Sequence, residues 1–131
     1  MISTKGRYAI RFMIDLAAND NGAPIPLDIV AARHEISKKY LEIIAQMLVK
    51  GKLVKGTSGK GGGYYLTKKP EEYTVYDILE LTEGSMSPVA CLEKDAEPCS
   101  FRAKCKTISM WEGYSKLQYD YFSNITIKDL L

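Results

Sequence analysis

Five of the eight residues from 56 to 63 are glycine, and this run lies between two segments of strand composition, residues 52–55 and 64–67. Glycine adopts backbone conformations that other residues avoid, so such a run is typical of a hairpin tip. Neither the Gly-Lys-Ser/Thr ending nor the following helix of a nucleotide-binding loop is present. We therefore predict a small two-stranded wing, with Lys60 exposed at its tip and a backbone that can approach phosphates closely.

Three helices are predicted ahead of the wing. The first begins at Ser3 or Thr4 and ends near residues 19–22, the second covers residues 27–33, and the third begins at Ser37 and ends at Gly51. Three residues separate the second helix from the third, which is typical of a helix-turn-helix. The apolar positions expected in the core are Ala9, Phe12, Met13, Leu16, Ala17, Leu27, Val30, Ala31, Leu41, Ile44 and Leu48.

Charge divides the chain into two parts. Residues 1–69 contain 12 Lys and Arg against 5 Asp and Glu, a balance of +7, whereas residues 70–131 contain 6 against 11, a balance of −5. A basic half favours an anionic partner, and nucleic acid is the commonest one, although a solvated charged surface is the alternative. The free face of the third helix carries side chains that can hydrogen-bond base edges and phosphates: Ser37, Lys38, Lys39, Glu42 and Gln46.

Two further helices are predicted after the wing. Thr74 caps one that ends at Gly84, with Val75, Ile78, Leu79 and Thr82 on its buried face. The other covers residues 105–123, and Met110, Tyr114, Leu117 and Tyr121 form a wide apolar stripe along it. A small domain has little core left to cover this stripe, so we expect a second subunit to cover it; packing along the first helix is the alternative.

Three cysteines, Cys91, Cys99 and Cys105, lie in one 15-residue window of an aperiodic loop that contains Pro88 and Pro98. Their odd number argues against a disulfide framework and leaves free thiols, catalysis or metal ligation open, zinc included. No signal peptide or membrane span is recognisable, so we expect a cytoplasmic protein. We expect no enzyme activity, because Cys-x-x-Cys, paired histidines and a nucleophile elbow are all missing.

Several motifs together carry a family resemblance. Residues 3–9, 36–42, 61–66 and 75–80, with Glu83-Gly84, resemble the bacterial winged-helix regulators that include the iron–sulfur cluster regulator IscR, the nitric-oxide sensor NsrR, the iron regulator RirA and the cysteine-metabolism regulator CymR. The resemblance covers nearly the whole chain. It implies a mainly α fold with a winged helix-turn-helix over residues 1–84, a cysteine-bearing loop over 85–104, and a dimerisation helix and tail over 105–131.

The resemblance also implies a homodimer that binds double-stranded DNA at a palindromic operator, with the third helix in the major groove and the wing in the minor groove. Ser58 stands where IscR-like wings often carry an arginine, so the minor-groove contact would depend on Lys60 or be weaker. The predicted DNA-binding residues are Lys5, Arg7, Ser37, Lys38, Lys39, Tyr40, Glu42, Gln46, Ser58, Lys60, Gly61 and Gly62.

Members of the family that bind a cluster carry three cysteines before the dimer helix, and Cys91, Cys99 and Cys105 match that placement. The resemblance therefore implies an iron–sulfur cluster, with two or four irons, that gates operator binding. In IscR-type proteins a histidine follows the last cysteine by three residues, but that position is Ile108 here, and the only histidine, His34, is predicted to be a surface or capping residue. The candidates for a fourth ligand are Tyr8, Asp15, Glu93, Asp95 and Glu97.

Two alternative functions stay open at this stage. A cluster-free, thiol- or partner-responsive transcriptional repressor would use the same DNA-binding fold. An iron–sulfur carrier or electron-transfer protein would need no recognition helix, and it would show no salt-dependent DNA binding.

Overall fold

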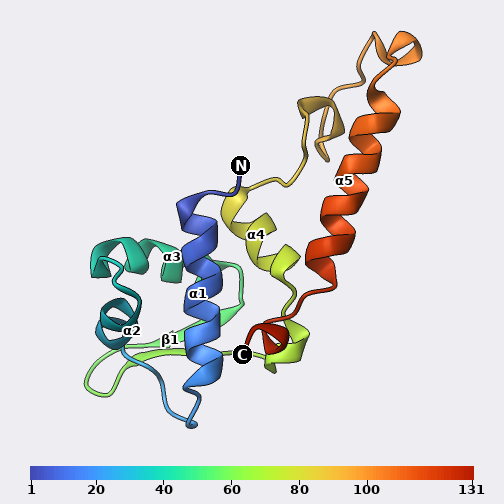
Figure 1. The fold of residues 1–131 in the computed structure, drawn as a ribbon. Helices are drawn as coiled ribbons and strands as arrows, with labels where there is room; N and C mark the ends of the chain where they lie inside the picture. The colour runs from blue at the N-terminus through green and yellow to red at the C-terminus, as the bar shows by residue number, and fades with distance from the viewer.

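The computed structural model describes all of residues 1–131, which form five α-helices and one two-stranded hairpin (Figure 1). The predicted fold class, a mainly α winged helix-turn-helix, is confirmed. The elements in chain order are α1 (Thr4–Ala18), α2 (Leu27–His34), α3 (Lys38–Lys50), β1 (Val54–Thr57), β2 (Gly63–Leu66), α4 (Val75–Glu83) and α5 (Ile108–Ser123), with short 3₁₀ turns at Pro70–Glu72, Ala90–Leu92, Arg102–Lys104 and Lys128–Leu130. None of the helices is both long enough and apolar enough to cross a membrane.

Helix α1 lies at the centre of the N-terminal part, where it contacts α2, α3, α4 and β2. Its start is fixed by Ser3, whose side chain accepts a hydrogen bond from the Gly6 N–H. The apolar positions predicted for α1 to α3 lie in one buried cluster, except Ala17, which packs half-buried against it. The helical spacing of the sequence therefore identified the core correctly, because each helix buries a single stripe.

The wing differs from the prediction at its edges. The strands pair antiparallel with Val54 opposite Leu66, two residues later than predicted for the first strand. Lys52 cannot belong to the strand, because its positive φ of 62° places it in the turn that follows α3. Tyr64 also pairs with Ile25, just before α2, so the wing is joined to the helix-turn-helix by two backbone hydrogen bonds.

Tyr73 fastens the wing to the helices. Its side chain is buried, and its hydroxyl donates a hydrogen bond of 2.8 Å to the Leu53 carbonyl while it accepts bonds of 2.9 Å from the N–H groups of Thr67 and Lys68. Leu53 and Thr67 flank β1 and β2, so one phenol spans both strands at their open end. The wing is thereby held in a fixed direction relative to α4.

The chain end returns to the core after α5. Ile127 is fully buried, its N–H donates to the Tyr73 carbonyl, and the Val75 N–H donates to the Ile125 carbonyl. These contacts anchor the C-terminal end of α5 beside the start of α4. Helix α5 begins at Ile108, three residues later than predicted, because Cys105 has an extended backbone.

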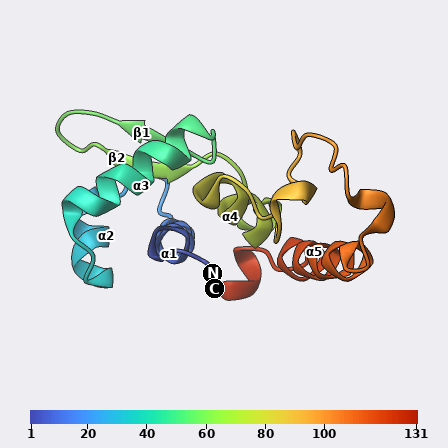
Figure 2. The ribbon, with the colours of Figure 1, turned by 90° about the horizontal axis from the view of Figure 1, so that it is seen from above.

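In both views α5 lies on the far side of α1 and α4 from α2 and α3 (Figures 1 and 2). It packs against α4, with Tyr119 edge-to-face on Tyr76 at a ring distance of 4.8 Å, so the alternative of packing along the first helix is wrong. No residue of α5 is buried. The loop from 85 to 107 connects the two helices and extends beyond the N-terminal end of α5 (Figure 1).

Candidate nucleic-acid interface and cysteine loop

The free face of α3 carries the side chains predicted to bind DNA. Lys38, Lys39, Glu42 and Gln46 are exposed, while the opposite stripe of the helix is buried. Ser37 caps the helix, because its hydroxyl accepts a hydrogen bond from the Tyr40 N–H. A polar, solvent-facing stripe backed by a rigid apolar stripe can present its donors and acceptors to a DNA groove without rearrangement.

Tyr40 lies at the edge of this face and joins it to α1. The ring is half-buried and packs edge-to-face on Tyr8, with ring centroids 5.9 Å apart. The Arg11 guanidinium lies over the Tyr8 ring, 5.2 Å from its centre. Tyr8 is therefore a packing residue between α1 and α3 in this structure.

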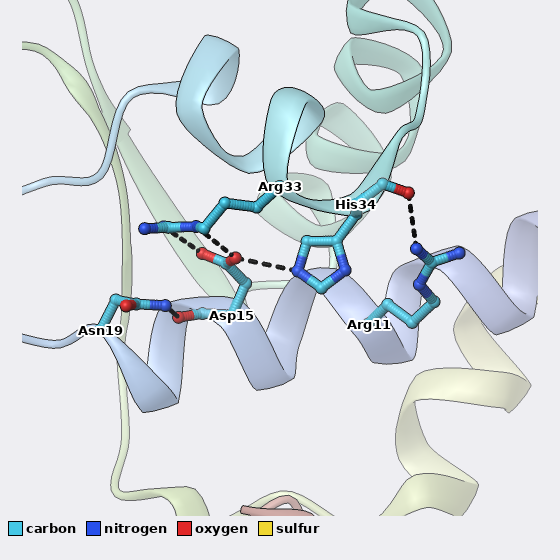
Figure 3. Close-up of polar contacts among 5 residues, drawn as sticks. All are labelled: Arg11, Asp15, Asn19, Arg33 and His34. Carbon is cyan, nitrogen blue, oxygen red and sulfur yellow. Dashed lines mark hydrogen bonds and ion pairs between the residues drawn. The ribbon is translucent and has the colours of Figure 1, made fainter.

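An ion-pair network fixes the turn between α2 and α3 (Figure 3). Asp15 of α1 has a side chain only 2% exposed, and its two carboxylate oxygens accept hydrogen bonds of 2.9 and 2.7 Å from Arg33. His34 Nε2 lies 2.8 Å from the same carboxylate, and Arg11 donates a bond of 2.6 Å to the His34 carbonyl. These bonds fasten the end of α2 to α1, and so set where α3 begins.

Two expectations are corrected by this network. Asp15 is not available as a fourth metal ligand, because both of its oxygens are engaged by Arg33 and His34. His34 is not a plain surface or capping residue, since its ring bonds a buried carboxylate on another helix. The sequence signal for this network was weak: Asp15 interrupts the apolar stripe of α1 next to Leu16, and a buried charge requires a partner.

The wing tip owes its shape to its glycines. Gly59 and Gly61 have φ of 84° and 79°, the left-handed region that favours glycine. A Cβ at Gly62 would lie 2.4 Å from the Thr57 carbonyl oxygen, so this glycine permits the tight turn itself. Ser58, Lys60 and Gly61 are exposed at the tip. The glycines thus give the tip a thin backbone profile that a DNA backbone can approach closely.

Two more predicted DNA-binding residues lie in the first turn of α1. Arg7 is exposed and donates a hydrogen bond of 3.2 Å to the Thr4 hydroxyl, and Lys5 is half-exposed. The nearby Gly6 lets α1 approach α4 closely, since a Cβ there would lie 2.3 Å from Glu83 Oε1. Glu83 in turn accepts hydrogen bonds from the Ser3 N–H and hydroxyl. The first turn of α1 is therefore fixed by contacts with the end of α4.

The cysteine loop has little contact with the rest of the chain. Cys91 and Cys99 are exposed, Cys105 is half-buried, and all three are unpaired thiols. Met86 is the one buried residue at the start of the loop, where its carbonyl accepts a hydrogen bond from Gln118 of α5. The expected convergence of the three sulfurs is not present: nowhere in the chain do three His, Cys, Asp or Glu side chains lie close enough together to hold a metal ion.

One thiol has a shifted acidity. The Thr107 hydroxyl lies 3.5 Å from Cys105 Sγ, and a hydrogen bond from it to sulfur holds the pKa of that thiol below its ordinary value. The Thr107 and Ile108 backbone and the charge of Arg102 lower the pKa further, while partial burial opposes them. Thiolate is the form that binds metals, so Cys105 is well suited to act as a ligand.

The predicted apolar stripe of α5 lies in solvent. Met110, Tyr114, Leu117 and Tyr121 are between 53% and 69% exposed, the highest value being that of Leu117. The half-buried Trp111 and Phe122 line a pocket with Met1, Ile2, Met86 and Pro88 beside the stripe. An exposed apolar surface of this extent on a long helix is typical of a protein interface.

Comparison with known proteins identifies the family. The profile of the Rrf2 family, described as iron-dependent transcriptional regulators, matches residues 2–131. The chain belongs to the Rrf2 family. It is 33% identical over 130 residues to the HTH-type transcriptional regulator IscR of Escherichia coli strain K12, a match that covers 99% of this chain and 79% of IscR.

Solved structures of Rrf2 proteins agree with this fold. The global cysteine regulator CymR of B. subtilis superposes with a TM-score of 0.79 at 35% identity and covers 99% of this chain and 95% of its own. The IscR of T. potens superposes with a TM-score of 0.74 at 32% identity, covering 99% and 85%. This Rrf2 chain is therefore a DNA-binding transcriptional regulator like IscR and CymR.

Proposed function

We propose that this Rrf2 protein is a homodimeric regulator of a palindromic operator, whose affinity for DNA is set by an iron–sulfur cluster on Cys91, Cys99 and Cys105. One observation carries the proposal. Three unpaired thiols occupy an exposed loop that leads directly into α5, the helix whose apolar stripe is uncovered. A sensor of this kind needs its ligands next to the element that joins the two subunits. We call the DNA-binding part of each subunit, residues 1–84, its reading head.

The DNA contacts are assigned to three groups of residues. Ser37, Lys38, Lys39, Tyr40, Glu42 and Gln46 of α3 enter the major groove, Ser58, Lys60, Gly61 and Gly62 of the wing reach the minor groove, and Lys5 and Arg7 bind phosphates. Among these, Glu42 and Gln46 have the acceptors and donors that distinguish bases, whereas the lysines and Arg7 position the protein through charge. The basic balance of residues 1–69 supports this assignment.

The dimer is assigned to the stripe of α5. Burial of four large apolar side chains from each of two copies is a strong driving force, since each buried side chain of this size contributes about 1.5–3 kcal/mol. A twofold axis through paired α5 helices would place two copies of α3 on two half-sites of one operator. Residues 105–131 then act as the dimerisation helix and tail, and residues 1–84 as the reading head.

The donor set of the loop fits an iron–sulfur cluster chemically. Cysteine thiolates are the usual ligands of such clusters, and all three thiols are unpaired. Cys105 has its pKa lowered by Thr107 and Arg102, which favours the thiolate. The loop carries few tertiary contacts that would resist its rearrangement around a common centre. A bound cluster would supply a centre that responds to iron, oxygen or nitric oxide.

The fourth ligand is assigned to an oxygen donor of the loop. Glu93, Asp95 and Glu97 are exposed and lie between the first two cysteines, and none of them forms an ion pair. The Tyr8 ring contacts both Tyr40 and Arg11, and Asp15 is buried in its ion-pair network. A loop carboxylate can therefore join the thiolates without breaking the packing of the head.

The chain offers a mechanical route from the loop to the head. Convergence of the three thiolates would order residues 87–107 and pull on the N-terminal end of α5. The Gln118 bond to the Met86 carbonyl and the Tyr76–Tyr119 contact transmit that movement to α4, which packs on α1. The spacing of the two α3 helices, and hence operator affinity, would then follow the state of the loop.

The DNA assignment is tested by salt-dependent binding. The probe is a duplex of about 30 base pairs, enough for two half-sites one turn apart, selected by the protein from a random-sequence pool. Lys39→Ala and Lys60→Ala should each weaken binding and lower the slope of log affinity against log salt by about one, whereas Lys116→Ala on α5 should leave both unchanged. Equal DNA affinities and equal salt slopes in all three variants would overturn the assignment.

The cofactor assignment is tested by metal content. Protein purified without oxygen should contain iron and acid-labile sulfide and should absorb visible light, and a Cys91→Ala, Cys99→Ala, Cys105→Ala variant should have lost all three properties. A colourless, iron-free wild type that binds DNA would favour the rival reading of a thiol- or partner-responsive repressor. An iron-containing protein with no salt-dependent DNA binding would favour a cluster carrier.

A further inference from the structure

A groove opens between α2, α3 and the wing, and it contains one acidic residue that the DNA assignment does not use. Its lining includes Lys38, Glu42 and Gln46 of α3, Gly61 and Gly62 of the wing tip, and Asp28 from the first turn of α2. The groove therefore has one lysine and two carboxylates. This is an unusual charge balance for a surface that faces the polyanionic DNA backbone.

Asp28 is bound to the lysine of this groove. Asp28 Oδ1 lies 2.9 Å from Lys38 Nζ, and both side chains are solvent-exposed, at 72% and 54%. The hydrogen bond and charge of Lys38 lower the pKa of Asp28, and those of Asp28 raise the pKa of Lys38. Both groups are therefore charged at neutral pH. In the absence of DNA, the ammonium group already has an anionic oxygen as its partner.

The Lys38 ammonium group has three N–H donors and Asp28 occupies one of them, so a phosphate that binds Lys38 lies beside the carboxylate or replaces it. In either case the Asp28 carboxylate stays in the same groove and repels the phosphate, and where it is replaced it loses its counter-charge and attracts a cation from solution. A free lysine releases one condensed counterion when it binds a phosphate, but here the cation taken up by the carboxylate offsets that release. Lys38 therefore contributes little net free energy to DNA binding while Asp28 is present.

We propose that Asp28 is an affinity-setting residue that competes with DNA phosphates for Lys38. The inference rests on the proposed assignment of α3 to DNA. Because phosphate contacts carry no sequence information, the competition lowers the affinity for operator and for unrelated DNA by the same factor. Base contacts by Glu42 and Gln46 then provide a larger share of the free energy of DNA binding, because the sequence-independent contribution of the phosphate contacts is smaller.

The test is DNA binding by Asp28→Asn over a range of salt concentrations. The probes are the pool-selected duplex and a random-sequence duplex of the same length. We expect binding to both probes to tighten by the same factor, about two- to fivefold at low salt, and the salt slope to steepen by about one. The net-charge control is Glu71→Gln, which removes an exposed carboxylate from the 3₁₀ turn before α4 and should give a much smaller gain.

A Lys38→Ala background completes the experiment. There, Asp28→Asn should lose most of its effect, because the competing pair no longer exists. Unchanged binding by Asp28→Asn, a gain no larger than that of Glu71→Gln, or the full gain in the Lys38→Ala background would each overturn the proposal. Tightening confined to the selected duplex would also overturn it, since that result would make Asp28 a base-reading residue.

Failure of this proposal is distinguishable from failure of the DNA assignment. If Lys39→Ala and Lys60→Ala weaken binding while Asp28→Asn has no effect, α3 and the wing bind DNA but Asp28 does not compete. If none of the three changes binding, the surface itself is assigned wrongly. Both residues of the pair are exposed, so the variants should fold as the wild type does, and thermal unfolding verifies this.

Discussion

The two ends of this molecule are stabilised to different degrees. From α1 to α4 the chain has a large buried apolar core with a smaller buried cluster beside it, and even its polar interior groups, Asp15 and the Tyr73 hydroxyl, are fully bonded. From residue 87 to residue 126 no side chain is buried. The reading head, with Ile127 from the chain end, is thus a well-packed structure, whereas the loop and α5 leave large apolar side chains exposed to solvent. Under the proposed function, that region is where a second subunit and a cofactor would change the molecule at little cost to its fold.

The largest expected effect is on self-association. Leu117→Glu places a carboxylate in the proposed dimer interface of both copies and removes a leucine contact worth about 1.5–3 kcal/mol from each. The dissociation constant should rise by at least about a hundredfold, as measured by sedimentation equilibrium. Ser109→Glu adds the same charge to α5 outside the stripe and should leave dimerisation intact. Equal dissociation constants for the two variants would show that the stripe is not the interface.

The next effect concerns buried and exposed ion pairs. Asp15→Asn should lower the free energy of unfolding by about 2–3 kcal/mol, because it weakens charged hydrogen bonds around a buried group. Glu112→Gln removes the exposed pair with Arg102 at the other end of the molecule and should cost less than about 1 kcal/mol. Urea unfolding of the two variants measures the difference. Similar losses of unfolding free energy in the two variants would mean that the reading head is not packed better than the loop and α5.

A smaller loss of stability is expected at the base of the wing. Tyr73→Phe leaves two N–H groups without their partner and the Leu53 carbonyl with only its bond from the Thr67 hydroxyl, and it should cost about 1–3 kcal/mol. Faster amide exchange at Thr67 and Lys68 should accompany it. Tyr65→Phe, on the exposed face of the wing, is the matched control and should change neither property. Unaltered exchange at Thr67 in the first variant would refute the fastening role of Tyr73.

The smallest effect tests the acidity of the loop. The lowered pKa of Cys105 means that its thiolate persists to lower pH, so Thr107→Val should reduce the thiolate fraction at neutral pH. Alkylation of Cys105 in iron-free protein lacking the other two cysteines should slow by about two- to fivefold at pH 7. The two rates should converge above the ordinary pKa of a thiol. A constant ratio at every pH would mean that Thr107 affects access to the sulfur and not its ionisation.

The sequence predicted the structure of the reading head more accurately than that of residues 85–131, for a physical reason. Helical apolar spacing and caps such as Ser37, Thr74 and Gly84 are local signals, and each of these residues has the expected role. The network of Asp15, Arg33 and His34 was missed because its members are 18 and 19 positions apart and no periodicity links them. The return of Ile127 to the core was missed for the same reason.

For the cysteine loop, the sequence predicted an irregular segment but not where its side chains lie. Its cysteines are recognisable by type and spacing, but no apolar periodicity specifies where their side chains lie, and the structure does not bring them together. Asp28 illustrates a different limit. Its position in the first turn of α2 is ordinary for an acidic residue near a helix N-terminus, and its contact with Lys38 appears only when α2 and α3 are placed side by side.

The most direct test of the proposed function compares operator affinity with and without the three cysteines of the loop. Wild-type protein is reconstituted with iron and sulfide in the absence of oxygen, and its binding to the duplex that it selects is compared with that of the Cys91→Ala, Cys99→Ala, Cys105→Ala variant at one salt concentration. We expect the two dissociation constants to differ by at least about tenfold, the range of ordinary allosteric coupling. Equal affinity and equal sequence preference would contradict the claim that the cysteine loop governs how this protein reads DNA.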